Sequence, residues 1–196
     1  LIAGTLLLLL ITLPLFGCAP ETGEAGTVTL GKIGPLSGGT AFVGKEALNG
    51  MIMAAEQISA AGGFRVAGKK YNFKIESYDD EATPAKAVAG SQRLKQMFDI
   101  PVVFVDLSGS TLAIMETNEQ AGVLVASTGA DPRITQKGNK LVMRVNSPAS
   151  VSAKVQGEAT VKALGKIKMA TINDTSDWGK AFNKIYTDTV KAGGIQ

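Results

Sequence analysis

Short apolar runs alternate along the chain with amphipathic stretches, and polar turns rich in glycine separate them. The apolar runs carry many β-branched residues, which is typical of buried strands. They predict strands at 28–36, 71–78, 101–105, 123–126, 141–145 and 167–172. The amphipathic stretches place apolar residues three and four apart, which is typical of helices that pack by one face. They predict helices at 45–61, 84–98, 111–121, 149–164 and 178–192.

The turn that follows the predicted strand 101–105 is the first candidate for a site. Leu107, Ser108, Gly109 and Ser110 lie between this strand and a helix. Such a turn directs free backbone N–H groups and hydroxyls to the carboxyl edge of a sheet, where open α/β folds bind ligands and anions. A purely structural role explains the same residues, with Ser110 as the N-cap of the helix.

The other strand exits share this composition. The loops 37–44, 127–131 and 173–177 are rich in Ser, Thr, Gly and Asp. Strands and helices alternate regularly, which predicts an α/β fold with doubly wound parallel sheets and helices on both faces. Because parallel strands end at one edge, we expect the four loops to converge. Ordinary turns are also polar, so composition alone does not establish a site.

The first residues are strongly apolar and are set apart from the fold. Residues 1–17 contain no charge and ten Leu or Ile, which predicts a signal peptide. As a helix they would span about 25 Å, less than the bilayer core of about 30 Å. The sequence ending in Gly17-Cys18 resembles a bacterial lipobox, which implies lipidation of Cys18; an uncleaved anchor is the alternative. Residues 18–26 then form a tether, and we expect an exported lipoprotein at the cell surface or in the periplasm.

The amino-acid composition limits the partners, metal sites and catalytic groups that are expected. The formal net charge is +3 with dispersed Lys and Arg, so nucleic acid is not an expected partner. His is absent, and Cys18 is the only cysteine, which removes the usual metal ligands and the commonest general base. Composition does not exclude an enzyme, but the usual catalytic groups are missing, and we predict no metal, no cofactor and no enzymatic activity.

One motif argues for an enzyme and fails at its last position. Gly39 to Lys45 matches the phosphate-binding loop G-x-x-x-x-G-K, but Glu46 stands where Ser or Thr would hold magnesium. A phosphoryl-transfer enzyme is thus the weakest alternative. Carboxylates at 79–81 favour capping of the helix that follows by Asp80 or Thr83.

An ordered series of segments resembles the branched-chain amino-acid type of solute-binding protein of ABC transporters, with the type I periplasmic fold. The matching segments are 33–38, 50–63, 78–80, 108–111, 121–123, 127–130 and 177–179. The resemblance implies two α/β lobes that close over a small polar solute and deliver it to the membrane subunits of an ABC permease. A ligand-sensing receptor of the same fold is the alternative.

The resemblance also implies which residues contact the solute. Ser108 and the turn at Ser110 would bind a carboxylate or similar group, and backbone groups near Gly129 and Ala130 would contact the same end. The complete implied set is Ser37, Phe42, Val43, Leu107, Ser108, Gly109, Ser110, Gly129, Ala130, Asp131 and Trp178. Asp131 departs from the hydroxyl residue of amino-acid binders, so it either caps a helix or repels a carboxylate.

The resemblance also implies where the chain divides into two lobes. We expect an N-terminal lobe at 27–146 and the start of a second at 147–196. The first residue is Leu, and the last follow a Gly-Gly pair, so we expect a fragment whose second lobe is incomplete. The solute stays open among amino acids, short amides, urea-like compounds and aromatic acids.

Overall fold

The computed structural model describes residues 26–195. The predicted signal peptide, the predicted lipidation site Cys18 and most of the tether lie outside the described residues. Among the described helices, none combines the length and the apolar character needed to cross a bilayer.

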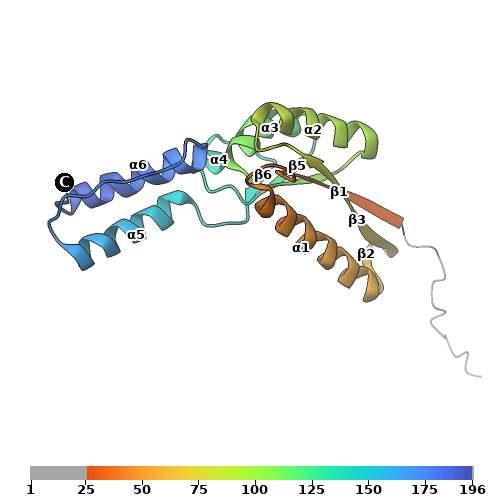
Figure 1. The fold of residues 1–196 in the computed structure, drawn as a ribbon. Helices are drawn as coiled ribbons and strands as arrows, with labels where there is room; N and C mark the ends of the chain where they lie inside the picture. Colours follow the sequence, from red (N-terminus) through yellow and green to blue (C-terminus); the bar gives the residue numbers. More distant parts are fainter. Residues whose placement is uncertain (1–25, 196) are drawn as a thin grey trace, which may run out of the picture.

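The strands of residues 26–195 form a 6-stranded sheet in the order β2-β3-β1-β4-β5-β6 (Figure 1). All neighbours are parallel except β2 and β3, so the predicted parallel sheet is confirmed. The strands are β1 Gly26–Gly34, β2 Phe64–Val66, β3 Lys69–Asp79, β4 Val102–Val105, β5 Leu124–Ser127 and β6 Val142–Arg144.

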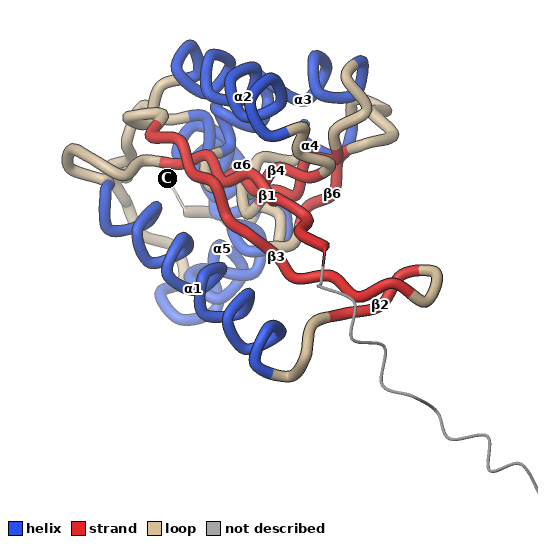
Figure 2. The backbone as a smooth tube through the Cα atoms, turned by 90° about the vertical axis from the view of Figure 1, so that its right-hand side faces the viewer, coloured by secondary structure: helices blue, strands red, loops and turns tan. Residues whose placement is uncertain are grey.

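Helices cover both faces of the sheet. Figures 1 and 2 place α2 and α3 against one face and α1 against the other, while α5 and α6 extend away as a parallel pair. The helices are α1 Ala41–Ala60, α2 Pro84–Phe98, α3 Ser108–Gln120, α4 Arg133–Gln136, α5 Ala149–Leu164 and α6 Asp177–Ala192. Three of the predicted helices, at 84–98, 149–164 and 178–192, therefore match the structure closely.

The main core lies between the sheet and the helices α2 and α3. Alternation along β1 directs Ile33 into this core, while Lys32 points to the face that carries α1. The core residues are Ile33, Ala87, Leu94, Ile100, Val103, Val105, Ile114, Val123 and Val125. Packing of this set fixes where each strand ends, and thereby where each turn begins.

The edge strand β2 was not predicted from the sequence. It pairs antiparallel with β3 through a tight turn in which Ala67 and Gly68 have φ of 49° and 81°. The Phe64 ring stacks on Phe73, with centroids 4.3 Å apart. A strand this short shows no alternation, so the aromatic pair is what holds it.

The predicted strand at 167–172 is wrong. These residues have irregular backbone that runs along the α5–α6 pair (Figure 1). A strand needs a neighbour for its N–H and C=O groups. Every strand of the described residues lies in the one sheet, and none borders this segment.

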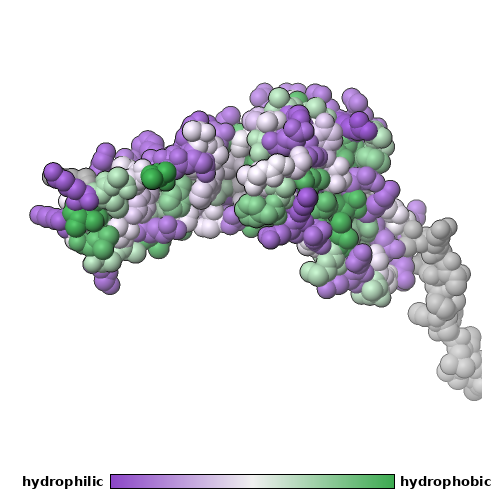
Figure 3. Space-filling model, in the orientation of Figure 1, coloured by the Kyte–Doolittle hydropathy of each residue, from purple (hydrophilic) through white to green (hydrophobic). Residues whose placement is uncertain are grey.

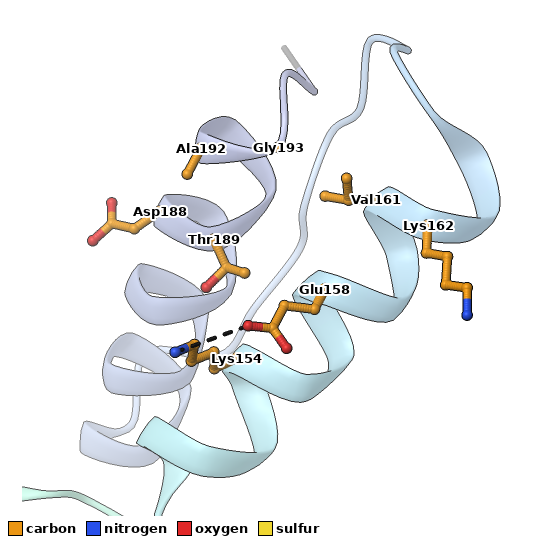
Figure 4. Close-up of a pocket in the computed structure, with 8 residues that line it drawn as sticks. All are labelled: Lys154, Glu158, Val161, Lys162, Asp188, Thr189, Ala192 and Gly193. Atoms are coloured by element: carbon orange, nitrogen blue, oxygen red, sulfur yellow. Dashed lines mark ion pairs between the residues drawn. The ribbon is translucent and has the colours of Figure 1, made fainter.

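The α5–α6 pair packs through a small residue and one polar contact. Gly157 lies against Thr189, and the hydroxyls of Thr160 and Tyr186 are 2.9 Å apart. Beyond them the helices enclose an open groove lined by Lys154, Glu158, Val161, Lys162, Asp188, Thr189, Ala192 and Gly193 (Figure 4). Figure 3 shows hydrophobic surface at the end of the pair away from the sheet, where α5 ends at the exposed Leu164.

Candidate functional site

The carboxyl ends of four strands meet at one edge of the sheet. Gly34 at the end of β1 aligns with Asp79 of β3, Ile33 aligns with Val105 of β4, and Val105 aligns with Ser127 of β5. The loops that leave these strands therefore emerge side by side (Figure 1). This confirms the predicted convergence of the loops 37–44, 107–110 and 127–131.

The turns after β4 and β5 are locked together. The N–H of Asp131 donates to Ser108 Oγ at 3.2 Å, and the hydroxyls of Thr111 and Ser127 are 2.7 Å apart. A Cβ added to Gly129 would lie 2.9 Å from the Cα of Ser108, so only glycine permits this approach. Ser108 and Gly129, predicted from separate motifs, are thus buried in direct contact with each other.

Ser110 is bound inside the protein. Its hydroxyl is buried and donates to Asp80 Oδ2 at 2.6 Å, which ties α3 to the end of β3. The predicted N-cap role is not observed, because α3 begins at Ser108 with Leu107 as its N-cap residue. The α2 cap is also simpler than expected: Asp80 Oδ1 accepts from the N–H of Ala82, and Thr83 makes no side-chain cap bond.

The β1–α1 loop is held by the end of β3. Asp79 Oδ1 accepts from the N–H of Leu36 at 2.8 Å and from that of Glu81 at 2.9 Å. Burial by itself raises the pKa of Asp79, but hydrogen bonds from the Ser37 hydroxyl and these N–H groups outweigh it and lower the pKa. Sequence reasoning missed Asp79 at this edge, although it follows directly from the predicted strand 71–78.

A buried ion pair lies directly beneath the same edge. Lys32 Nζ contacts Asp106 Oδ2, and both side chains are almost fully buried. Lys32 also donates to the carbonyl of Ile33 at 3.2 Å. Burial raises the pKa of Asp106, and attraction to Lys32 offsets only part of that effect.

Asp131 is paired with a cation rather than presented to a ligand. Its side chain is 1% exposed and accepts from Arg133 Nη2 at 2.7 Å and from the Arg133 N–H at 2.8 Å. Burial raises the pKa of Asp131, but these bonds and the charge of Arg133 outweigh it and lower the pKa. Of the two roles left open for Asp131, the structure favours holding the start of α4.

The start of α6 faces this surface. Arg133 Nη2 donates to Asp177 Oδ1 at 2.8 Å, and a Cβ at Gly109 would lie 2.9 Å from Asp177 Oδ2. These contacts bring loop 173–177 to the same edge, as predicted, although the strand expected before it is missing. The adjacent Trp178 is 44% exposed, and its ring centroid is 5.3 Å from that of Phe182.

The remaining predicted residues lie around these turns. Phe42 is 64% exposed and Val43 is half-buried in the first turn of α1, directly after the loop of Ser37. Leu107 is half-buried ahead of α3. Ala130 is buried, and its carbonyl accepts from the N–H of Ala149 at 2.7 Å.

The glycine-rich motif does not form a phosphate-binding loop. Helix α1 begins at Ala41, so Gly44 and Lys45 are already helical. Gly44 is buried against the carbonyl of Pro35, and Lys45 is exposed. A phosphate cradle needs these residues as a loop before the helix, which excludes the phosphoryl-transfer alternative at this motif.

The profile of the family described as periplasmic binding protein matches residues 27–196. An amino acid binding protein of Pseudomonas aeruginosa is 33% identical over 162 residues, which are 82% of this chain and 42% of that protein. A leucine-, isoleucine-, valine-, threonine- and alanine-binding protein of the same organism is 30% identical, over 92% of this chain and 48% of its own length.

A solved structure is similar over the same region. It is a solute binding protein of an ABC transporter from Rhodopseudomonas palustris BisB5 in complex with 3,4-dihydroxybenzoic acid. The TM-score is 0.73 at 25% identity, covering 86% of this chain and 46% of that one. The chain thus spans under half the length of the relatives it matches.

Proposed function

The chain belongs to the family of type I periplasmic solute-binding proteins, and we propose that it captures a small polar solute for delivery to the membrane subunits of an ABC permease. The observation that carries this proposal is the meeting of the Ser108 turn, the Gly129 turn and the start of α6 at one sheet edge. The similar proteins named above are binding proteins, which supports a non-catalytic role.

The proposed contacts divide the solute into a polar and an apolar end. Ser108 and the backbone of Gly109 and Gly129 would bind the polar end, since hydroxyls and helix-start N–H groups suit such a group. Phe42 and Trp178, both exposed beside this edge, would cover the apolar end. Amino acids and aromatic acids, or their amides, are the proposed solute class, in line with what the relatives are named for.

Placement of the protein in the cell is also proposed from the sequence. Residues 1–17 would direct export, and Cys18 would carry the lipid that anchors the protein to a membrane. The solute would lie between an N-terminal lobe at 27–146 and a second lobe that begins at 147. Metabolic labelling with a palmitate analogue tests the anchor: Cys18→Ser must abolish the label.

Calorimetry on the intact protein tests the binding role. Titration with L-leucine and 3,4-dihydroxybenzoate should give saturable binding by at least one of them. Ser108→Ala should weaken it by about tenfold, since one hydrogen bond contributes about 1–1.5 kcal/mol. Ser59→Ala is the matched control, because Ser59 donates only to a carbonyl of its own helix, that of Ala55. Equal affinities of wild type and Ser108→Ala would remove the assigned site.

A further inference from the structure

One carboxylate already occupies the surface that the proposed solute would use. Asp177, the first residue of α6, lies so close to Gly109 that a Cβ there would be 2.9 Å from its Oδ2. Its Oδ1 accepts from Arg133 Nη2 at 2.8 Å. The charge of Asp177 therefore stands directly over the turn between β4 and α3.

Arg133 does not need Asp177 as a partner. The guanidinium already binds the buried carboxylate of Asp131 through Nε and Nη2, at 2.7 to 3.1 Å. Asp177 is the second anion on Arg133, while Arg144 donates to the backbone carbonyl of Asp131 at 3.1 Å and supplies a further positive charge near that carboxylate. Of the two lysines that line the same hollow, Lys184 is bound to Asp188 at 2.7 Å, and Lys180 is exposed on α6.

Exposure separates the two carboxylates of this cluster. The side chain of Asp131 is 1% exposed, whereas that of Asp177 is 38% exposed. An exposed ion pair contributes little to stability. Asp177 is therefore the carboxylate that can move at little cost, and the one whose charge an incoming solute meets first.

We propose that Asp177 is a specificity-determining residue. Its carboxylate occupies the place beside Gly109 and Arg133 where a solute carboxylate would bind, and it therefore selects solutes whose polar end is neutral. This inference rests on the proposed solute site. An anionic solute must displace Asp177 from Arg133 or bind beside it. At a separation of about 5 Å and an effective dielectric constant of about 40, the repulsion corresponds to roughly a tenfold weaker Kd.

Removing the charge of Asp177 tests the proposal. The variant Asp177→Asn keeps the shape and the polar helix start, and Asp177→Ser is a second variant in case the first folds poorly. Asp188→Asn is the matched control, because Asp188 lies on the same helix and is bound to Lys184 at a similar distance of 2.7 Å. The probes are 3,4-dihydroxybenzoate and L-leucine, each against its amide, titrated by calorimetry into the intact protein.

The expected result is a split between acids and amides. Asp177→Asn should tighten binding of both carboxylates by about tenfold and change the amides by less than about twofold. Asp188→Asn should leave all four affinities unchanged. Binding of a carboxylate by Asp177→Asn where wild type binds none would equally support the inference.

Three results would overturn it. An equal change for acid and amide, an equal effect of Asp188→Asn, or unchanged or weaker acid binding would each show that the charge of Asp177 does not select the solute. In those cases wild type still binds a probe, so the proposed function survives. If neither wild type nor either Asp177 variant binds any probe, the proposed function and the inference fail together.

Discussion

Replacing Lys32 by Met should destabilise the protein strongly and make its stability depend on pH. Lys32 and Asp106 form an ion pair whose side chains are 1% and 4% exposed. Met keeps the length of the stem but leaves Asp106 as an unpaired buried carboxylate. Removing one partner of a buried pair costs about 3–5 kcal/mol, because the remaining charge has lost its compensation.

The direction in which stability changes with pH follows from the pKa of Asp106. Burial already raises the pKa of Asp106 in the folded state, and loss of Lys32 removes the attraction that opposes it. A carboxyl whose pKa is raised by folding contributes most to the stability of the folded state below its unfolded pKa of about 3.9. This contribution is lost as the pH rises through the pKa of the folded state. Between about pH 5 and pH 7, the free energy of unfolding of Lys32→Met should therefore fall by up to about 2.7 kcal/mol relative to that of wild type.

Urea unfolding followed by circular dichroism measures both quantities. The double variant Lys32→Met/Asp106→Leu is the control, since it has no carboxylate to titrate. It should recover most of the loss, because replacing a buried pair by apolar groups is often neutral. A Lys32→Met protein within about 1 kcal/mol of wild type at neutral pH, or one that gains stability as the pH rises, would refute the reasoning.

Two further predictions concern the turns and the titration of the site. Gly129→Ala places a Cβ 2.9 Å from Ser108 Cα and from Ile134 Cδ1, so unfolding in urea should show a loss of about 1–3 kcal/mol and calorimetry weaker solute binding. Gly50→Ala, where a Cβ meets nothing within 4 Å, should show no such loss. Solute affinity should be nearly constant between about pH 6 and 8, because His is absent and the pKa values of Asp79 and Asp131 are lowered. A steep change in calorimetric affinity within that range would instead point to Asp106, whose pKa is raised.

The sheet could be predicted because the apolar residues in the sequences of its strands indicate that these strands are buried. The runs that became β4 and β5 are apolar on both faces, as strands of a parallel sheet covered by helices are. The same property misled the prediction at 167–172, where an apolar run has no neighbouring strand among the described residues. Strand β2 shows the reverse case, since Phe64–Val66 is too short for any pattern and depends on the ring of Phe73.

The site was predictable in position but not in the direction of its side chains. Polar residues at a strand exit either tie neighbouring loops together or face a solute, and both uses select the same residue types. Ser110 and Asp131, predicted to face a solute, bind Asp80 and Arg133 inside the protein. The partner of Ser110 comes from the end of another strand, so its own turn could not reveal it, whereas Arg133 lies two residues after Asp131 and fits the capping role left open for that residue.

Burial distinguishes polar residues that tie loops together from those that can face a solute, which composition cannot do. A buried polar side chain at this edge is already satisfied by a partner, because leaving it unpaired costs about 1–3 kcal/mol. Exposed groups retain the freedom to exchange water for a solute, and the buried Ser108 uses its Oγ as the acceptor for the N–H of Asp131, which leaves its hydroxyl hydrogen for a solute. Ser37, Phe42 and Trp178 are exposed, and Asp177 and its partner Arg133 are partly exposed charges at the same edge. Since Asp177 faces Gly109 from α6, the polar end of a solute meets an anion as well as N–H donors. The chemistry at this edge therefore favours a polar group that both donates and accepts hydrogen bonds, as an amide does, over one that only accepts.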